Sequence, residues 1–172
     1  MLTSDTVLAV VSRPALLVLL TISAILAWPL GRLVSPDRRR LGALFVFTLG
    51  AVLAATTTTG AWRPSAALIP AYLDGFGDPA YLVGGFAGSR EKIANLGLFL
   101  PLGLLAGVLR RRYAAALVLL AALTFTIELW QAFIGRGGDA VDVVHNTVGA
   151  LLGLGLAKLV HPRRSRTVHD GL

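Results

Sequence analysis

The sequence contains no cysteine and few charged residues. The absence of cysteine excludes disulfides, thiol nucleophiles and cysteine-ligated metals. Charged residues make up 15% of the 172 residues, whereas a soluble globular domain carries roughly 25%. Apolar residues are abundant instead: 55% of the residues are hydrophobic and the mean hydropathy is +0.74. These values are typical of an integral membrane protein, and the length suits one compact helical domain.

The start of the chain also lacks the basic residues that open a cleavable signal peptide. Its first residues, MLTSDTV, contain Asp5 and no lysine or arginine. Signal peptides have a positively charged region there, and the apolar run that follows is long enough to span a bilayer. We therefore expect this first apolar segment to be kept as a membrane helix.

Five apolar runs approach the roughly 20 residues that a spanning helix needs. They cover residues 14–34, 41–59, 92–109, 113–134 and 139–160. The sequence thus predicts an all-α integral membrane bundle of about five transmembrane helices. Residues 1–161 form a single transmembrane domain in this interpretation, and residues 162–172 form a basic cytoplasmic tail.

The basic residues predict how the helices cross the membrane. Arginine clusters fall at 38–40, 110–112 and 163–166, and five spans place all of them on one side. Cytoplasmic loops carry the excess of Lys and Arg, so we expect a multi-pass protein of the cell membrane with its N-terminus outside and its C-terminus in the cytoplasm. In this topology 11 of the 16 Lys and Arg residues are cytoplasmic. The net charge of +7 therefore predicts contact with anionic lipids and not with nucleic acid.

The longest connection, about residues 60–91, is external in this topology. It is rich in glycine, proline and aromatic residues, including Trp62, Tyr72 and Tyr81. Aromatic residues commonly mark the membrane interface, and a connection of this length is often functional. Two interpretations stay open: a lid over a site, or an amphipathic segment that rests on the membrane.

Polar residues lie where apolar helices would normally exclude them. They occur in or beside the last three spans: Asn95, Glu128, Gln131, Asp139, Asp142 and Asn146. Such groups are costly in a bilayer and indicate a functional site by default. The topology places them all in the outer leaflet, and the i, i+3, i+7 spacing of Asp139, Asp142 and Asn146 places these three on one helix face. Gly149 and Gly153 continue that face with a small-xxx-small pattern, which permits close helix packing.

Arg136 stands in the short turn between the last two spans, among three glycines. Its planar guanidinium suits a carboxylate or a phosphate, so we expect it to be the counter-ion of Glu128, Asp139 or Asp142. His145 lies off the centre of the polar face. We interpret it as a donor at the membrane interface and not as a metal ligand, because no second histidine is near.

Three stretches of these spans resemble the VanZ-like family. They read NLGLFLPLG from Asn95, ELWQ from Glu128 and RGGDAVDVVHNTVG from Arg136. The ordered set of Asn, Pro-x-Gly, Glu, Gln, Arg, Asp, Asp, Asn and Gly is specific as a whole, and the resemblance covers about residues 91–153. Spans one and two match only in being apolar. Gly137 and Gly138 depart from the bulkier residues expected between the Arg and the first Asp, and we expect them to loosen that turn.

The resemblance implies a bacterial polytopic membrane protein. The namesake of the family is linked to resistance to glycopeptide antibiotics, particularly those of the teicoplanin type, which act on cell-wall precursors outside the membrane. The resemblance thus implies a role in the cell envelope that affects glycopeptide susceptibility, and it leaves the molecular activity undefined.

Three functions stay open for the six polar residues and Arg136. The leading one is binding of a membrane-lipid headgroup or a lipid-linked envelope precursor, with carboxylates accepting hydroxyl or ammonium donors and Arg136 and Lys92 binding phosphate. The second is an enzyme in which Glu128 and Asp142 act as general acid and base, or in which a divalent cation is held by Glu128, Asp139, Asp142 and Asn146. The third is a structural network that ties helices together. No nucleophile or established metal-ligand spacing accompanies these residues, and the sequence does not identify a cofactor.

Overall fold

The computed structural model describes residues 14–58, 63–84, 90–110 and 112–160, so the predicted tail lies outside the described residues. The long elements in these ranges are α2 (Pro14–Val34), α3 (Arg39–Thr57), α6 (Arg90–Leu109), α7 (Tyr113–Phe133) and α8 (Ala140–Val160). All five are long and apolar enough to cross a membrane. The predicted all-α bundle of membrane helices is therefore confirmed, with helix ends within two residues of the predicted spans.

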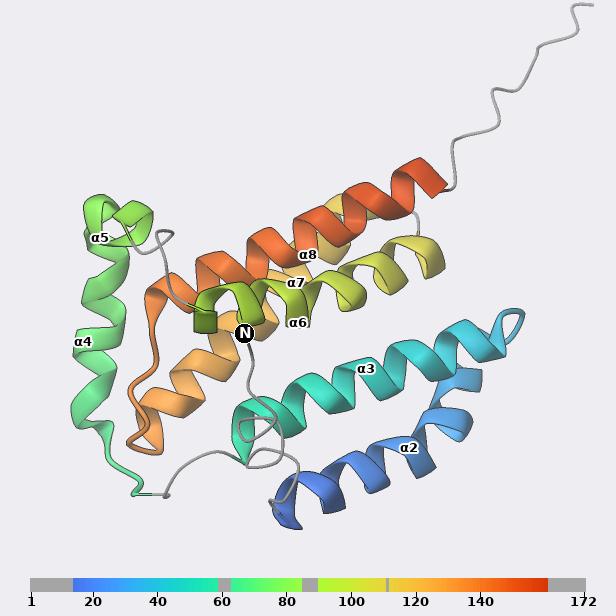
Figure 1. Ribbon diagram of the computed structural model, residues 1–172, viewed down its shortest axis with the longest axis horizontal. Coiled ribbons are helices and arrows are strands. Elements are labelled where there is room, and N and C mark those ends of the chain that lie inside the picture. The colour runs from blue at the N-terminus through green and yellow to red at the C-terminus, as the bar shows by residue number, and fades with distance from the viewer. Residues whose placement is uncertain (1–13, 59–62, 85–89, 111, 161–172) are drawn as a thin grey trace, which may run out of the picture.

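Helices α6 and α8 lie side by side, run in the same direction and pack through glycine (Figure 1). Gly149 lies against the carbonyl of Leu96, and Gly153, one turn further on, lies against the carbonyl of Leu100. A Cβ atom at either glycine would overlap that carbonyl oxygen, so the two backbones approach more closely than a larger residue would allow. The small-xxx-small face predicted from the sequence is the face that packs.

Helices α2 and α3 form an antiparallel hairpin beside the other three long helices (Figure 1). The backbones of Gly31 and Gly42 are in contact within this hairpin. Helix α3 joins the hairpin to the rest, because one hydrophobic cluster takes side chains from α3, α6, α7 and α8: Val52, Phe99, Leu102, Ala106, Leu120, Ile127 and Ala150. Helix α2 keeps a largely exposed apolar surface, including Ile25 and Leu33, as a lipid-facing helix should.

The chain between α3 and α6 forms short helices beside one end of α7 and α8 (Figure 1). They are η1 (Ala66–Leu68), α4 (Ile69–Asp74), η2 (Gly75–Gly77) and α5 (Pro79–Gly84). Helix α4 contacts α7, and α5 contacts α8. We call this the loop end of the bundle, and we call the opposite end, which carries Arg110 and Lys158, the basic end.

Two hydrogen bonds fasten the start of this loop to the end of α7. The N–H of Arg63 donates to the carbonyl of Ile134 at 3.0 Å, and the N–H of Ser65 donates to the carbonyl of Phe133 at 2.7 Å. The last carbonyls of a helix have no partner within the helix. The loop supplies partners here, so it is packed onto the helix ends and covers them.

Glycines close the turn between α7 and α8. Gly135 has a φ of 80° and Gly137 a φ of 73°, in the left-handed region that favours glycine. The N–H of Arg136 bonds back into α7 at 2.9 Å, which is how a helix that ends on such a glycine satisfies its carbonyls. A Cβ atom at Gly138 would overlap the carbonyl of Glu128. The expectation that Gly138 loosens the turn is therefore wrong, because its missing side chain lets the turn pack against α7. A Cβ atom at Gly137 would meet nothing within 4 Å, so no contact tests the expectation for that residue.

Candidate functional site

Glu128 lies in the last two turns of α7, and only 3% of it is exposed. Its Oε2 atom accepts a hydrogen bond from the backbone N–H of Asp139 at 3.2 Å. The charges of Asp139, Asp142 and Arg136 act on the same carboxyl group. Three carboxyl groups and one guanidinium therefore gather at the loop end, where α7 ends and α8 begins.

Asp139 precedes the first residue of α8 and caps that helix. Its Oδ1 atom accepts the N–H of Val141 at 2.8 Å, a contact that satisfies one of the unpaired donors at a helix start. The same oxygen accepts the hydroxyl of Tyr81 at 2.8 Å. One carboxylate thus stabilises α8 and holds α5 against it.

A second polar contact lies one turn further into the bundle. The Nδ2 atom of Asn146 donates to the hydroxyl oxygen of Thr124 at 2.8 Å, and both residues are buried. Thr124 and Glu128 are four residues apart on α7, as Asp142 and Asn146 are on α8, so each pair shares a helix face. We call the resulting group the polar seam: Thr124, Glu128, Asp139, Asp142 and Asn146.

Asn146 also provides an acceptor without a partner. It is 2% exposed, and its Oδ1 atom makes no hydrogen bond to any described residue. An unsatisfied buried acceptor costs roughly 1–3 kcal/mol. Together with the nearby carboxyl groups, this oxygen makes the polar seam rich in acceptors, an arrangement that suits a ligand with hydroxyl or ammonium donors.

Arg136 reaches from the turn to a third helix. Its guanidinium donates to the backbone carbonyl of Thr56 near the end of α3, and its charge acts on Glu128. The side chain is half-buried. Arg136 therefore provides positive charge beside the acidic residues, as predicted, and it also ties α3 to the α7–α8 turn, which the sequence did not indicate.

Tyr81 in α5 is a site residue that the sequence interpretation missed. Its hydrogen bond to Asp139, partial burial and the negative charges of Asp139 and Asp142 raise the pKa of Tyr81 to about 12. Asp78 positions it, because the Asp78 Oδ1 atom accepts the N–H of Tyr81 at 3.0 Å. The sequence does contain a signal for this helix: Asp78 is followed by Pro79, and proline is favoured in the first turn.

Tyr72 in α4 is the second residue that was missed. It is 2% exposed, and its hydroxyl donates to the Phe125 carbonyl at 3.1 Å. Burial and then the charge of Glu128 raise its pKa above the ordinary value. Its ring packs against Phe76 and Phe125 at centroid distances of 5.4 and 5.6 Å. The sequence alone places both tyrosines in a loop whose aromatic residues are typical of the membrane interface.

Three further candidates lie apart from this network. Asn95 precedes Leu96 on α6 and is half-buried. Within the described part of the chain, no hydrogen bond joins the side chain of Asn95 or Gln131 to the polar seam; Gln131 contributes its carbonyl to the turn. His145 is buried, and its Nδ1 atom lies 2.8 Å from the Val141 carbonyl of its own helix. His145 therefore acts as a donor within its own helix, and its position at the membrane interface stays a prediction.

The site presents hydrogen-bond acceptors and not an evident metal centre. In the described ranges, no group of three or more His, Asp or Glu side chains is arranged to hold a metal ion. The carboxylates of Glu128 and Asp139 instead accept N–H and O–H donors. The charge of Asp142 also acts on Glu128.

Comparison with protein families extends the sequence resemblance. A family model described as VanZ/LLP1 matches residues 15–161. The match includes α2 and α3 and so reaches well beyond the stretch of about residues 91–153 that carries recognisable motifs. No curated protein and no solved structure gives a significant match. With its five candidate membrane-spanning helices, the chain is a multi-pass membrane protein that belongs to the VanZ/LLP1 family.

Proposed function

We propose that the polar seam binds a membrane-lipid headgroup or a lipid-linked envelope precursor at the outer face of the cell membrane. The observation that carries this proposal is the gathering of acceptor oxygens, in which the carboxyl groups lie one turn from the unpartnered Oδ1 atom of Asn146. Such headgroups carry hydroxyl or ammonium donors. Hydrogen bonds from these donors to carboxylates are about twice as strong as neutral ones.

The contact between Tyr81 and Asp139 supports the chemistry of this proposal. A hydroxyl group from the loop already donates to the carboxylate at 2.8 Å. A hydroxyl of a headgroup would make the same contact after displacing Tyr81. Arg136 would then supply the positive charge for a phosphate, and Asn95 and Gln131 would border the ligand. Binding of a precursor in this way would alter the access of glycopeptides to it.

Contacts with backbone groups favour a second candidate, a structural network. Glu128 accepts from the Asp139 backbone, and Arg136 donates to the Thr56 carbonyl. Both contacts join separate segments without a ligand. Hydrogen bonds of this kind between membrane helices contribute about 0.6 kcal/mol on average, so a purely structural role predicts a loss of stability when they are removed.

The test uses Glu128→Gln, Asp142→Asn and Arg136→Ala, with Asp37→Asn as the control because Asp37 is exposed near the basic end. The full chain is purified, co-purifying lipid is identified by mass spectrometry, and glycopeptide susceptibility and envelope-lipid composition are measured in cells. We expect Glu128→Gln to retain roughly tenfold less bound lipid, since a charged hydrogen bond contributes about 1.5–3 kcal/mol. Susceptibility should change while the lipid composition stays constant.

The other outcomes separate the alternatives. Normal accumulation of all three variants, with bound lipid and susceptibility equal to wild type, contradicts the binding proposal. A lipid product that disappears with Glu128→Gln would indicate an enzyme. Loss of folded protein in the three variants, but not in Asp37→Asn, would indicate the structural network.

A further inference from the structure

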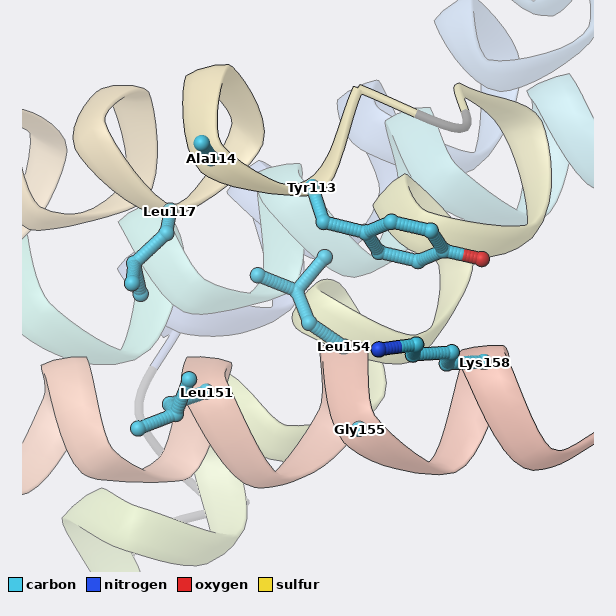
Figure 2. Close-up of a pocket in the computed structure, with 7 residues that line it drawn as sticks. All are labelled: Tyr113, Ala114, Leu117, Leu151, Leu154, Gly155 and Lys158. Carbon is cyan, nitrogen blue, oxygen red and sulfur yellow. The ribbon is translucent and has the colours of Figure 1, made fainter.

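A groove of about 370 Å³ lies at the basic end of the bundle, between α7 and α8. It is at the opposite end of these helices from the polar seam, since it includes Tyr113, the first residue of α7, and Lys158, in the last turn of α8. Figure 2 shows Tyr113 and Lys158 at one end of the groove and Leu117 and Leu151 at the other. The groove is therefore polar at one end and apolar along its length.

The apolar part of the groove is open to the membrane. Leu151 is 51% exposed, although it lies in the middle of a helix that is apolar enough to span a bilayer. A Cβ atom at Gly155 would meet nothing within 4 Å. Leu117 and Leu154 complete the apolar walls. A chain of methylene groups would cover this surface.

The polar end of the groove has the charge of an anion site. Lys158 is exposed, and Arg112, also exposed, directly precedes Tyr113. Among the described residues that line the groove, none is acidic. The ammonium of a zwitterionic lipid would find no carboxylate there, whereas a phosphate would be attracted to Lys158. Basic pockets between membrane helices bind anionic headgroups for this reason.

We propose that this groove binds one anionic glycerophospholipid, with an acyl chain along the leucine walls and its phosphate at Lys158 and the Tyr113 hydroxyl. The site is separate from the polar seam and does not depend on its function. It is more specific than the general attraction of basic residues to an anionic membrane surface, because it requires the groove as well as the charge.

The test is native mass spectrometry of the full chain released from detergent. The protein is incubated with phosphatidylglycerol or phosphatidylcholine of identical acyl chains. We expect one phosphatidylglycerol to be retained in preference to phosphatidylcholine. Lys158→Gln should weaken this retention about fivefold, which corresponds to roughly 1 kcal/mol per basic residue near a charged membrane surface.

Filling the groove tests the apolar part. Gly155→Leu adds a side chain whose Cβ atom meets nothing within 4 Å, and it should abolish retention of the bound lipid. Gly97→Leu is the matched control, because a Cβ at Gly97 also meets nothing within 4 Å but lies on α6, outside the groove. Arg32→Gln is the control for charge, since Arg32 is exposed near the end of α2.

The proposal is overturned by any of three results. The first is equal retention of the two lipids. The second is lipid retention in the Lys158 and Gly155 variants equal to that in their controls. The third is a Gly155→Leu variant that keeps its bound lipid but no longer forms a dimer. The last result would identify the groove as an interface between copies. Melting of each variant in detergent shows that it is folded, and the substitution of Gly155 favours the helix by roughly 1 kcal/mol.

Discussion

A single carboxylate, that of Asp139, links the membrane helices to the loop that covers them. It caps α8 and accepts the Tyr81 hydroxyl through the same oxygen. Glu128 in turn accepts the backbone N–H of Asp139. These hydrogen bonds form a chain from Tyr81 through Asp139 to Glu128. The position of α5 therefore depends on the ionisation of the groups that make them.

Alkaline pH should release this coupling. The folded pKa of Tyr81 is about 12, above the ordinary value of about 10. A group whose pKa is raised by folding contributes stability below its unfolded pKa and loses that contribution as the pH rises. We therefore expect full stabilisation below about pH 10 and its loss as the pH passes 12.

The measurement is a tyrosinate absorbance titration of the chain in detergent, with melting followed in parallel. Tyr81→Phe should remove the absorbance change near pH 12. The control Tyr113→Phe should retain that absorbance change. Ionisation of Tyr81 at the ordinary pH of about 10 would show that its contact with Asp139 does not hold in solution.

At the scale of elements, the most extensive packing between two described helices is that of α6 and α8. Glycine makes it possible, because the carbonyls of Leu96 and Leu100 occupy the space of two side chains. This packing holds α6 beside α8, the helix that carries Asp142 and Asn146 of the polar seam. The glycine-mediated contact is therefore part of the architecture of the site.

Gly153→Ala should separate these helices. The new Cβ would overlap the Leu100 carbonyl, and overpacking of this kind costs about 1–3 kcal/mol. Gly97→Ala is the control, because its Cβ meets nothing and alanine favours a helix by up to about 1 kcal/mol. Unfolding by a denaturing detergent measures both; equal stability of the two variants would contradict the packing described here.

The long helices were predictable because span length and hydropathy depend on local sequence alone. Glu128, Asp139, Asp142 and Asn146 were recognisable for the same reason, since each interrupts or borders an apolar run. Helix α5 was not recognised, because an element of six residues depends on contacts with α8. Aromatic residues of the loop fit a membrane interface equally well from sequence, and only the fold brings Tyr81 to Asp139.

At the scale of the whole molecule, the two ends of the bundle carry charges of different sign. Carboxyl groups gather at the loop end, and arginine and lysine residues lie at the basic end. This asymmetry follows the bias that sets membrane orientation. The predicted topology therefore assigns the polar seam to the outside and the lipid groove to the cytoplasmic side.

Reporter fusions check this orientation. A reporter fused after Arg112 should give a cytoplasmic signal. The same reporter fused after Gly77 should give an external signal. The second fusion serves as the control for the first, because α6 is the candidate membrane span between the two sites. An external signal at Arg112 would reverse the topology and with it both membrane assignments.

The loop anchors also impose an order of assembly. Tyr81 and its partner Asp139 are 58 residues apart, and Arg63 and Ser65 likewise bond to the end of α7, which is synthesised later. In the predicted topology, the loop crosses the membrane during translation before its partners on α7 and α8 have been synthesised. Under the proposed function, ligand binding at the polar seam would therefore appear only after α8 is in place, and a product truncated before α8 would not bind.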